Sequence, residues 1–390
     1  MTLSPRQLVA LAVALAAAAG CTDNNADSES SDSANASGQL TVLSTSDECE
    51  VSAESAPSGN LVFSIQNDGD QVTEFYLLAE DGERIIGEVE NIGPGLSRDL
   101  VVRAQPGSYV TACKPGMVGD GIRGEFTVDD SGDDGSPSSD ELTELETAAT
   151  DQYRDYVTQQ ADLLLAGTKE FAEAYKAGDD DKARALYAPI RVFWESIEPV
   201  AESFGDLDPK LDLREADLEE GQEWTGWHRI EKDLWPPAGY VPSTQEERDA
   251  VADQLVADTE ELVSRIGELE FTADQLGNGA KELLDEVATG KVTGEEEAWS
   301  HTDLWDFQAN VDGARIAYQA LRPIVLVKEP ELAETLDARF EELQAELDQY
   351  KEGDGFVLYT DLTPEQVKGL ADSVNALGEP LSTLTSVVVL

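Results

Sequence analysis

Basic residues are scarce in this chain of 390 residues. There are 26 Lys and Arg against 81 Asp and Glu, which gives a formal net charge of −55. Nucleic-acid binding needs clusters of Lys and Arg against the phosphates, so nucleic acid is excluded as a partner. An anionic membrane surface would repel the folded body for the same reason. The acidity suits a protein that faces high salt, and it concentrates cations around the chain without defining a site.

Long apolar runs are also lacking. One apolar run covers residues 8–19, which is too short to span a bilayer comfortably, and it follows Arg6 as in an export signal. The run ends in Ala-Ala-Gly-Cys at 18–21, and small residues directly before a cysteine resemble the bacterial lipobox. We therefore expect cleavage before Cys21 and lipid attachment to its thiol. An ordinary signal peptide with a chance cysteine is the alternative.

Changes in composition divide the chain into segments. After a signal peptide at 1–20, residues 21–38 are rich in Ser, Asp and Ala, which predicts a flexible tether. Residues 39–128 contain short β-rich runs between turn sequences, typical of a small β-sandwich. An Asp, Ser and Gly linker follows at 129–139, and residues 140–390 have the spacing of helices. The fold class is therefore multidomain, a β-sandwich followed by an antiparallel helical bundle.

The helical domain is predicted to contain long helices joined by short connections. The predicted helices are 140–177, 179–204, 213–234, 243–267, 273–289, 295–327, 331–351 and 364–378.

Histidine is almost absent, since the chain has two, and both His228 and His301 lie in the helical domain. His228 and Glu231 stand three apart on a predicted helix, so an imidazole and a carboxylate share a face and can reach one ion. Nearby tryptophans, including Trp227 and Trp235, indicate a mostly buried helix. A buried charged pair needs a partner, and a metal ion can supply it. The alternative is a surface ion pair or a hydrogen-bonded core histidine.

Two other predicted helices contribute acidic residues. Asp303 and Asp306 fall at helical spacing on one face, and Glu195 and Glu198 lie on an earlier helix. Carboxylates from different helices that converge on an imidazole are how helical bundles build metal sites. In a chain this acidic, each carboxylate taken singly is more often part of a solvated face.

Three strings carry a specific family resemblance. They read YAPIRVFWESIEPVAESFGDLDPKLDLRE, WTGWHRIEKDLW and HTDLWDFQANVDGA, and they resemble the EfeO family of iron-uptake proteins. The resemblance covers nearly everything after the tether. It implies a cupredoxin-like β-sandwich followed by an imelysin-like, or peptidase-like, helical domain. It also implies binding of ferrous or ferric iron outside the cytoplasmic membrane.

The resemblance implies that His228 and Glu231 bind this iron. We assign the further ligands to Glu198, Asp303, Asp306 and Glu195. The iron would pass to a membrane permease, with a haem peroxidase-like partner. The protein would be held by its lipid alone at the outer face of the cytoplasmic membrane, in the periplasm or at the cell surface.

The β-domain has no histidine, which excludes a blue-copper site for electron transfer. It does contain Cys49 and Cys113. The resemblance implies a second metal site, for copper or iron, on these cysteines with Glu74 and Glu50. A disulfide between the cysteines is the alternative in an oxidising extracytoplasmic space.

The leading interpretation is a metal-binding component of an uptake system that is not an enzyme. A metal-dependent hydrolase is the runner-up, because a metal held by His and Glu can activate water. The doubled-histidine motif His-Glu-x-x-His of metalloproteases is missing. A third interpretation is a polysaccharide- or partner-binding lipoprotein with a structural metal, since six tryptophans leave room for sugar stacking.

Overall fold

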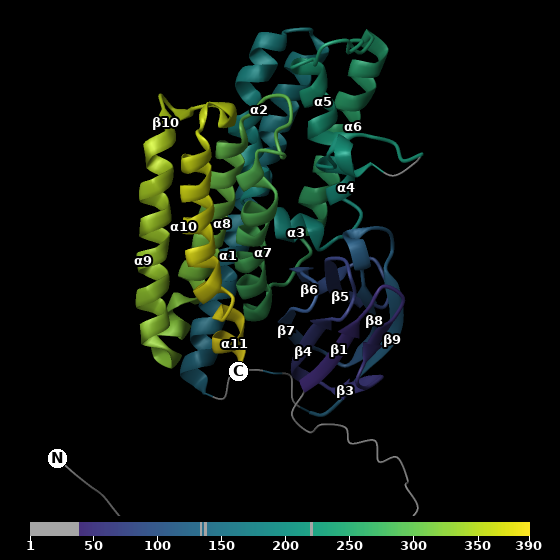
Figure 1. Cartoon of the computed structure of the whole chain (residues 1–390), viewed down its shortest axis with the longest axis vertical. Helices are drawn as coiled ribbons and strands as arrows, with labels where there is room; N and C mark the ends of the chain where they lie inside the picture. The colour runs from purple at the N-terminus through teal and green to yellow at the C-terminus, as the bar shows by residue number, and fades with distance from the viewer. Residues whose placement is uncertain (1–38, 133–134, 136–138, 219–220) are drawn as a thin grey trace, which may run out of the picture. The chain divides into compact units, whose positions relative to one another are not determined.

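Short strands form the first part of the chain in a computed structural model, which describes residues 39–390 except 133–134, 136–138 and 219–220. The predicted signal peptide, the tether and Cys21 lie outside the described residues. The strands, purple to blue in Figure 1, are β1 Gln39–Ser44, β2 Cys49–Val51, β3 Ser55–Pro57, β4 Gly59–Asn67, β5 Thr73–Ala79, β6 Ile85–Ile92, β7 Ser97–Ala104, β8 Gly107–Cys113 and β9 Ile122–Asp129.

These strands form two sheets, one in the order β2-β1-β4-β7 and one in the order β3-β9-β8-β5-β6. Strand β4 alternates buried and half-buried residues, as a strand with one face on a core does. Its Phe63 packs against Phe75 of β5 and Phe126 of β9, with ring centroids 5.3 and 5.5 Å apart. Aromatic side chains from both sheets therefore share one core, which confirms the predicted β-sandwich.

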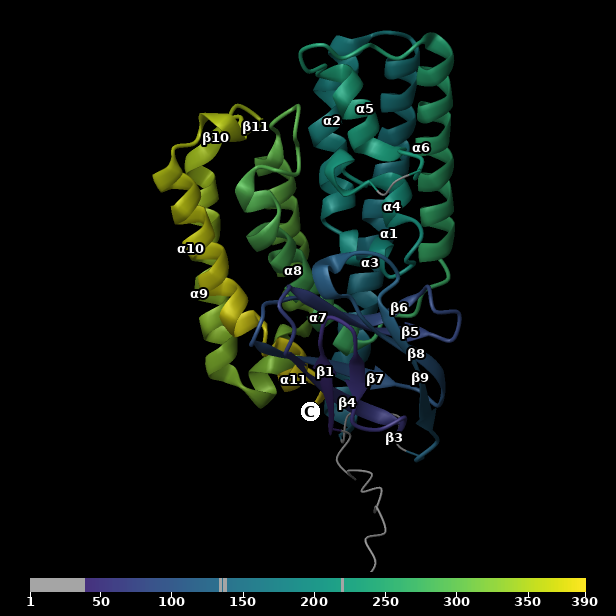
Figure 2. The ribbon, with the colours of Figure 1, turned by 45° about the vertical axis from the view of Figure 1, so that its right-hand side comes forward.

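Helices make up most of the remaining chain (Figures 1 and 2). They are α1 Asp140–Lys176, α2 Asp180–Glu195, α3 Glu198–Glu202, α4 Asp208–Leu211, α5 Gly226–Leu234, α6 Gln245–Ile266, α7 Ala273–Thr289, α8 Asp303–Lys328, α9 Pro330–Leu347, α10 Pro364–Leu381 and α11 Leu384–Val389. Helix α1 packs against α2, α6 and α8, while α9 packs against α10. Of the helices in the described residues, none has both the length and the apolar character that a bilayer crossing requires.

Three of the predicted helices are wrong over part of their length. The predicted helix 179–204 is interrupted at Ser196 and Ile197 and forms α2 and α3, so Glu195 and Glu198 lie on different helices. The predicted helix 213–234 is helical as α5 only from Gly226 onward, and the predicted helix 295–327 begins as α8 at Asp303. The segments before these two helices form turns and irregular structure instead. These irregular segments matter because they carry acidic residues of the candidate site described below.

The sandwich and the helices belong to one compact unit. Helix α7 packs against β6 and β7. Asn278 of α7 donates a hydrogen bond to the carbonyl of Val101 at 3.0 Å, and Arg98 pairs with Asp285 at 3.0 Å. A side chain–backbone hydrogen bond and a side-chain ion pair therefore link the sandwich to the helical domain.

Candidate metal centre

A glycine fixes where helix α5 begins. Gly226 has a φ of 85°, in the region that favours glycine, and a Cβ at this position would lie 2.1 Å from the carbonyl oxygen of Leu211. Only glycine permits this close approach. The first turn of α5 therefore starts directly against the segment that carries Asp212, and it brings His228 to that carboxylate.

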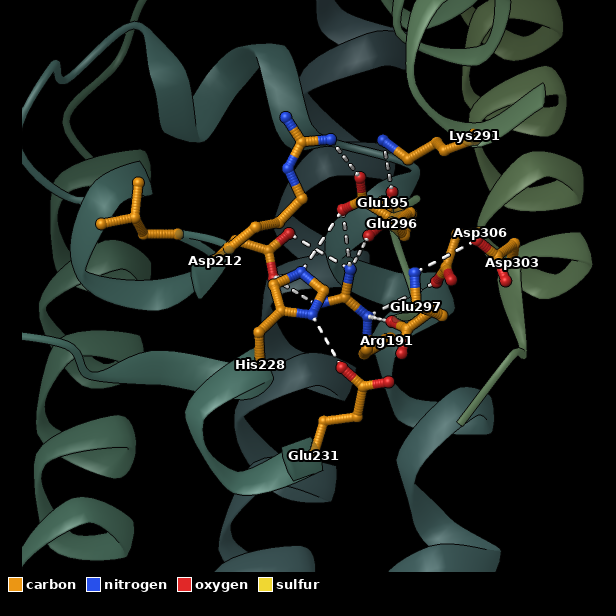
Figure 3. Close-up of polar contacts among 12 residues, drawn as sticks. Arg191, Glu195, Asp212, His228, Glu231, Lys291, Glu296, Glu297, Asp303 and Asp306 are labelled. Carbon is orange, nitrogen blue, oxygen red and sulfur yellow. Dashed lines mark hydrogen bonds and ion pairs between the residues drawn. The ribbon is translucent and has the colours of Figure 1, made fainter. Parts of the chain in front are cut away.

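His228 lies in the middle of an acidic cluster (Figure 3). The residue is 1% exposed. Its Nε2 lies 3.4 Å from Oδ1 of Asp212 and 3.4 Å from Oε1 of Glu296, and its Nδ1 lies 3.2 Å from Oε2 of Glu231. Among the described residues, Nε2 has no hydrogen-bond partner. The two ring nitrogens therefore differ: Nδ1 interacts with one carboxylate, and Nε2 faces two others without a hydrogen bond.

Glu231 is held from both of its oxygens. Its Oε1 accepts the backbone N–H groups of Trp299 at 2.9 Å and Ser300 at 2.7 Å, while Oε2 faces Nδ1 of His228. These bonds attach the irregular segment before α8 to helix α5. The same segment carries Glu296 and Glu297, so Glu231 both orients the imidazole and positions further carboxylates around it.

Arg191 of α2 is a buried cation at the same cluster, 0% exposed. It hydrogen-bonds to Asp212 and to Glu195, and its Nε forms an ion pair with Glu297 at 2.7 Å. Glu296 lies 3.5 Å from its Nη2. A guanidinium can contact several carboxylates at once because its nitrogens are spread in a plane. Arg191 therefore helps to neutralise an acidic interior that contains one histidine.

Protonation differs among the carboxyl groups. Burial raises the pKa of Asp212, Glu231 and Glu296, but the cations beside them outweigh burial and hold the pKa of each below its ordinary value. Burial alone would lower the pKa of His228, yet the negative charge of Asp212 and the neighbouring carboxylates of Glu231 and Glu296 raise it to about 10. The three carboxylates nearest to His228 are therefore ionised despite their burial.

Helix α8 carries the predicted residues Asp303 and Asp306, which are fully buried. Asp303 accepts the backbone N–H of Glu297 at 3.1 Å, and burial raises its pKa to about 6. Neither oxygen of Asp306 has a hydrogen bond within the described part of the chain, and Oδ1 lies 3.5 Å from Nε of Arg191. Burial and the charge of Glu195 raise the pKa of Asp306 well above its ordinary value. Both residues border the centre without contacting His228.

Glu195 and Glu198, the remaining predicted ligands in this domain, surround a lysine. Nζ of Lys291 lies 3.0 Å from Oε2 of Glu195 and donates a hydrogen bond to Oε2 of Glu198 at 2.9 Å. Neither glutamate belongs to the groups of possible metal ligands around His228 in the described chain. Of the predicted ligands in this domain, the structure therefore places only Glu231 beside His228.

A second group of carboxylates lies where the sandwich meets the helices. Ligand oxygens of Glu88, Glu202 and Glu282 lie within 4.8 Å of one another, and Glu202 also joins Glu198 and Asp208. Burial raises the pKa of Glu282 and of Asp208 to about 7. Neither histidine of the chain belongs to this group, which distinguishes it from the His228 centre.

The sandwich cysteines form a disulfide. Cys49 and Cys113 are bonded, with Cα atoms 5.6 Å apart. Cys113 is directly opposite Phe75 in the β5–β8 pairing and is fully buried in the apolar core of the sandwich. The two cysteines therefore form the disulfide that the sequence left open as the alternative to a metal site.

The side chains of Glu74 and Glu50 lie away from the cysteines, which favours the disulfide alternative over a metal site shared by these four residues. Successive side chains of a strand point to opposite faces, and Glu74 precedes the core residue Phe75. Its carboxylate accepts a hydrogen bond from the hydroxyl of Tyr76 at 2.7 Å on the other face of the sheet. Glu50 is exposed on β2.

Asp212, Glu296, Glu297 and Arg191 are the residues of the centre that the sequence analysis missed. Asp212 and the two glutamates lie in irregular segments that were predicted to be helical or left unassigned. The Glu295-Glu296-Glu297 run has the appearance of a solvated loop. Asp212 and Arg191 lie within the first of the three family strings, which was the one signal that could have directed attention to them.

Comparison with known proteins supports a family assignment. The family model described as Imelysin matches residues 149–384. Iron uptake system component EfeO of Escherichia coli O157:H7, of Escherichia coli strain K12 and of Shigella flexneri are each 38% identical to this chain over 359 residues, covering 90% of this chain and 91% of the relative. An imelysin-like protein of known structure from Psychrobacter arcticum 273-4 covers 62% of this chain and 92% of its own, at 13% identity and a TM-score of 0.43, which is too low to add to the assignment. The chain therefore belongs to the imelysin family and, within it, to the EfeO iron uptake system components.

Proposed function

We propose that this protein is an iron-binding component of an iron-uptake system and that it holds the ion at His228. The proposed ligands are Nε2 of His228, Oδ1 of Asp212 and Oε1 of Glu296. The observation that carries the proposal is the buried Nε2, which has no hydrogen bond among the described residues and faces two carboxylate oxygens at 3.4 Å. The printed name of the relatives, iron uptake system component, supports iron as the cargo.

The chemistry of these groups supports the same conclusion. One imidazole nitrogen with carboxylate oxygens is a suitable donor set for ferrous or ferric iron. Because the neighbouring carboxylates raise the pKa of His228 to about 10, binding through Nε2 would release a proton from the imidazole. Asp212 and Glu296 are ionised because cations hold their pKa below its ordinary value. Glu231 contacts the opposite ring nitrogen of His228, an arrangement that fixes the orientation and tautomer of a metal-ligating histidine.

The proposed role is not enzymatic, although the family model bears the name Peptidase M75. Metalloproteases of the His-Glu-x-x-His type use two histidines of one helix, and this centre contains one imidazole. Iron- or zinc-loaded protein is expected to hydrolyse casein no faster than the His228→Ala variant. Hydrolysis that depends on His228 would instead support the hydrolase alternative.

We also propose that the protein is exported and anchored by a lipid on Cys21 at the outer face of the cytoplasmic membrane. There it would deliver iron to a membrane permease, together with a haem peroxidase-like partner. The Ala-Ala-Gly-Cys sequence at 18–21 supports the anchor. Replacing Cys21 by Ser should release the protein from the membrane fraction, and full retention would contradict the anchor.

Iron titration of histidine variants tests the proposed site. His228→Ala should weaken iron binding by about 100-fold or more, because it removes a ligand. Loss of a residue that only hydrogen-bonds to a ligand typically weakens metal affinity by about 10- to 100-fold. The helix content measured by circular dichroism should stay near that of the wild type. His301→Ala is the matched control, since it removes the other imidazole, and it should bind iron normally. Equal affinity of His228→Ala and wild type would overturn the assignment.

A further inference from the structure

Arg191 and His228 share the same carboxylate oxygens. Oδ1 of Asp212 accepts a hydrogen bond from Nη1 of Arg191 and lies 3.4 Å from Nε2 of His228. Oε1 of Glu296 lies 3.5 Å from Nη2 of Arg191 and 3.4 Å from the same Nε2. These are the two oxygens proposed above to ligate the ion, so a cation at Nε2 and the guanidinium would both draw on them.

We propose that Arg191 is a built-in competitor of the bound ion and sets its affinity. This inference rests on the proposed function. A cation that binds Nε2 must take Oδ1 of Asp212 and Oε1 of Glu296 from the guanidinium, and the guanidinium regains them when the ion leaves. The exchange makes binding weaker than the bare donor set would give, and it makes the ion releasable.

The surroundings of Arg191 allow such an exchange. Three further carboxyl groups contact it: Glu195 by a hydrogen bond, Glu297 at 2.7 Å from Nε and Asp306 at 3.5 Å from Nε. Asp306 is fully buried, and neither of its oxygens is engaged in a hydrogen bond within the described chain. The guanidinium can therefore give up two oxygens and still remain paired, which avoids the large cost of an unpaired buried charge.

Lys291 provides an internal comparison. It is also fully buried and positively charged, and it contacts Glu195, Glu198 and Glu286 at 3.0, 2.9 and 3.7 Å. In the described chain its ion pairs do not include the two shared oxygens. Both cations repel a metal ion through space, but only Arg191 contacts the atoms that would bind it. Removing each cation in turn therefore separates direct competition from the general effect of charge.

The test uses full-length protein freed of metal by chelation and titrated anaerobically with Fe²⁺. Arg191→Met should bind Fe²⁺ at least tenfold more tightly than wild type. Its melting temperature without metal should fall, and Fe²⁺ should raise that temperature by more than it does in wild type. Lys291→Met should change the affinity by less than threefold. Arg103→Met, which breaks a partly buried pair with Glu146 elsewhere in the chain, should lower stability with and without Fe²⁺ and leave affinity unchanged.

Several results would overturn the inference. An Arg191→Met affinity equal to or weaker than wild type would assign Arg191 a purely structural role, and equal tightening by Lys291→Met would assign the effect to charge alone.

If Arg191→Met does not fold, Arg191→Lys takes its place. One ammonium cannot span both shared oxygens as the guanidinium fork does, so this variant should bind Fe²⁺ roughly threefold more tightly, and unchanged or weaker binding would contradict the inference. His228→Ala, titrated in parallel, distinguishes the proposed function from this inference. If His228→Ala binds Fe²⁺ like wild type, both fail. If His228→Ala binds more weakly but the Arg191 variant is unchanged, only this inference is overturned.

Discussion

The two regions that the sequence offers as metal sites, the His228 centre and the Cys49–Cys113 pair, are built in opposite ways. In the helical domain, an imidazole nitrogen without a hydrogen bond faces ionised carboxylates. In the sandwich, the two sulfurs bond to each other, and Cys113 packs in an apolar core. Donor atoms alone therefore do not make a site. What distinguishes the two regions is whether the donors are still free to bind a cation.

The glutamate assigned to each region shows the same contrast. Glu231 faces His228, and the resulting hydrogen bond lowers its pKa against the effect of burial. Glu74 faces Tyr76, and burial raises its pKa. Both residues are buried, at 0% and 7% exposure, and burial raises the pKa of each. His228 and the backbone N–H groups outweigh burial at Glu231, whereas Tyr76 and Lys114 do not outweigh it at Glu74.

The largest expected effect is the loss of stability on removing the Cys49–Cys113 disulfide. The double variant Cys49→Ser, Cys113→Ser should lose about 4 kcal/mol of unfolding free energy, because the disulfide closes a loop with a sequence separation of 64 residues. Denaturant unfolding measures this loss. Iron affinity, measured under conditions where the variant is still folded, should be unchanged. A clear loss of iron binding would mean that the cysteines contribute ligands after all.

A smaller effect, on iron affinity, is expected when Glu231 is replaced. Glu231→Gln should weaken iron binding by about 10- to 100-fold, the range for losing an outer carboxylate that orients a metal-bound histidine. Asp233→Asn is the control, because Asp233 is buried on the same helix and accepts hydrogen bonds from Tyr175 and Ser243 instead. Isothermal titration should give the control an affinity within about twofold of wild type. Similar losses in both variants would assign the effect to the stability of α5.

The smallest effect concerns Glu74. Its pKa is raised in the folded state, so the stability it contributes is fully present below about pH 4.5 and is lost as pH rises through its folded pKa. Glu74→Gln should therefore leave the melting temperature unchanged at pH 4 and raise it by about 1–2 °C at pH 8. Exposed Glu80→Gln should change neither value. An equal shift at both pH values would show that ionisation of Glu74 is not the cause.

The sequence predicted the architecture where local signals were strong. Helix α1 was expected at 140–177 and spans Asp140–Lys176, with Ser139 as its N-cap. Helix α6 begins at a capping box formed by Thr244 and Glu247. Turn sequences and short β-rich runs predicted the sandwich in the same way, because these features are encoded by residues close together in the chain.

The candidate site was predictable only in its local part. His228 and Glu231 lie three apart on one helix, so helical geometry alone brings them together. Asp212 and Glu296 come from irregular segments whose course depends on tertiary contacts, such as the bonds of Glu231 to Trp299 and Ser300. Periodicity contains no information about such contacts.

X-ray absorption at the iron edge of the loaded full-length protein reports which atoms bind the iron. An iron site at His228 should show one imidazole nitrogen with oxygen neighbours and no sulfur in the iron shell. The imidazole signal should disappear in His228→Ala and persist in the Cys49→Ser, Cys113→Ser variant. Sulfur ligation, or an unchanged imidazole signal in His228→Ala, would contradict an iron site at His228.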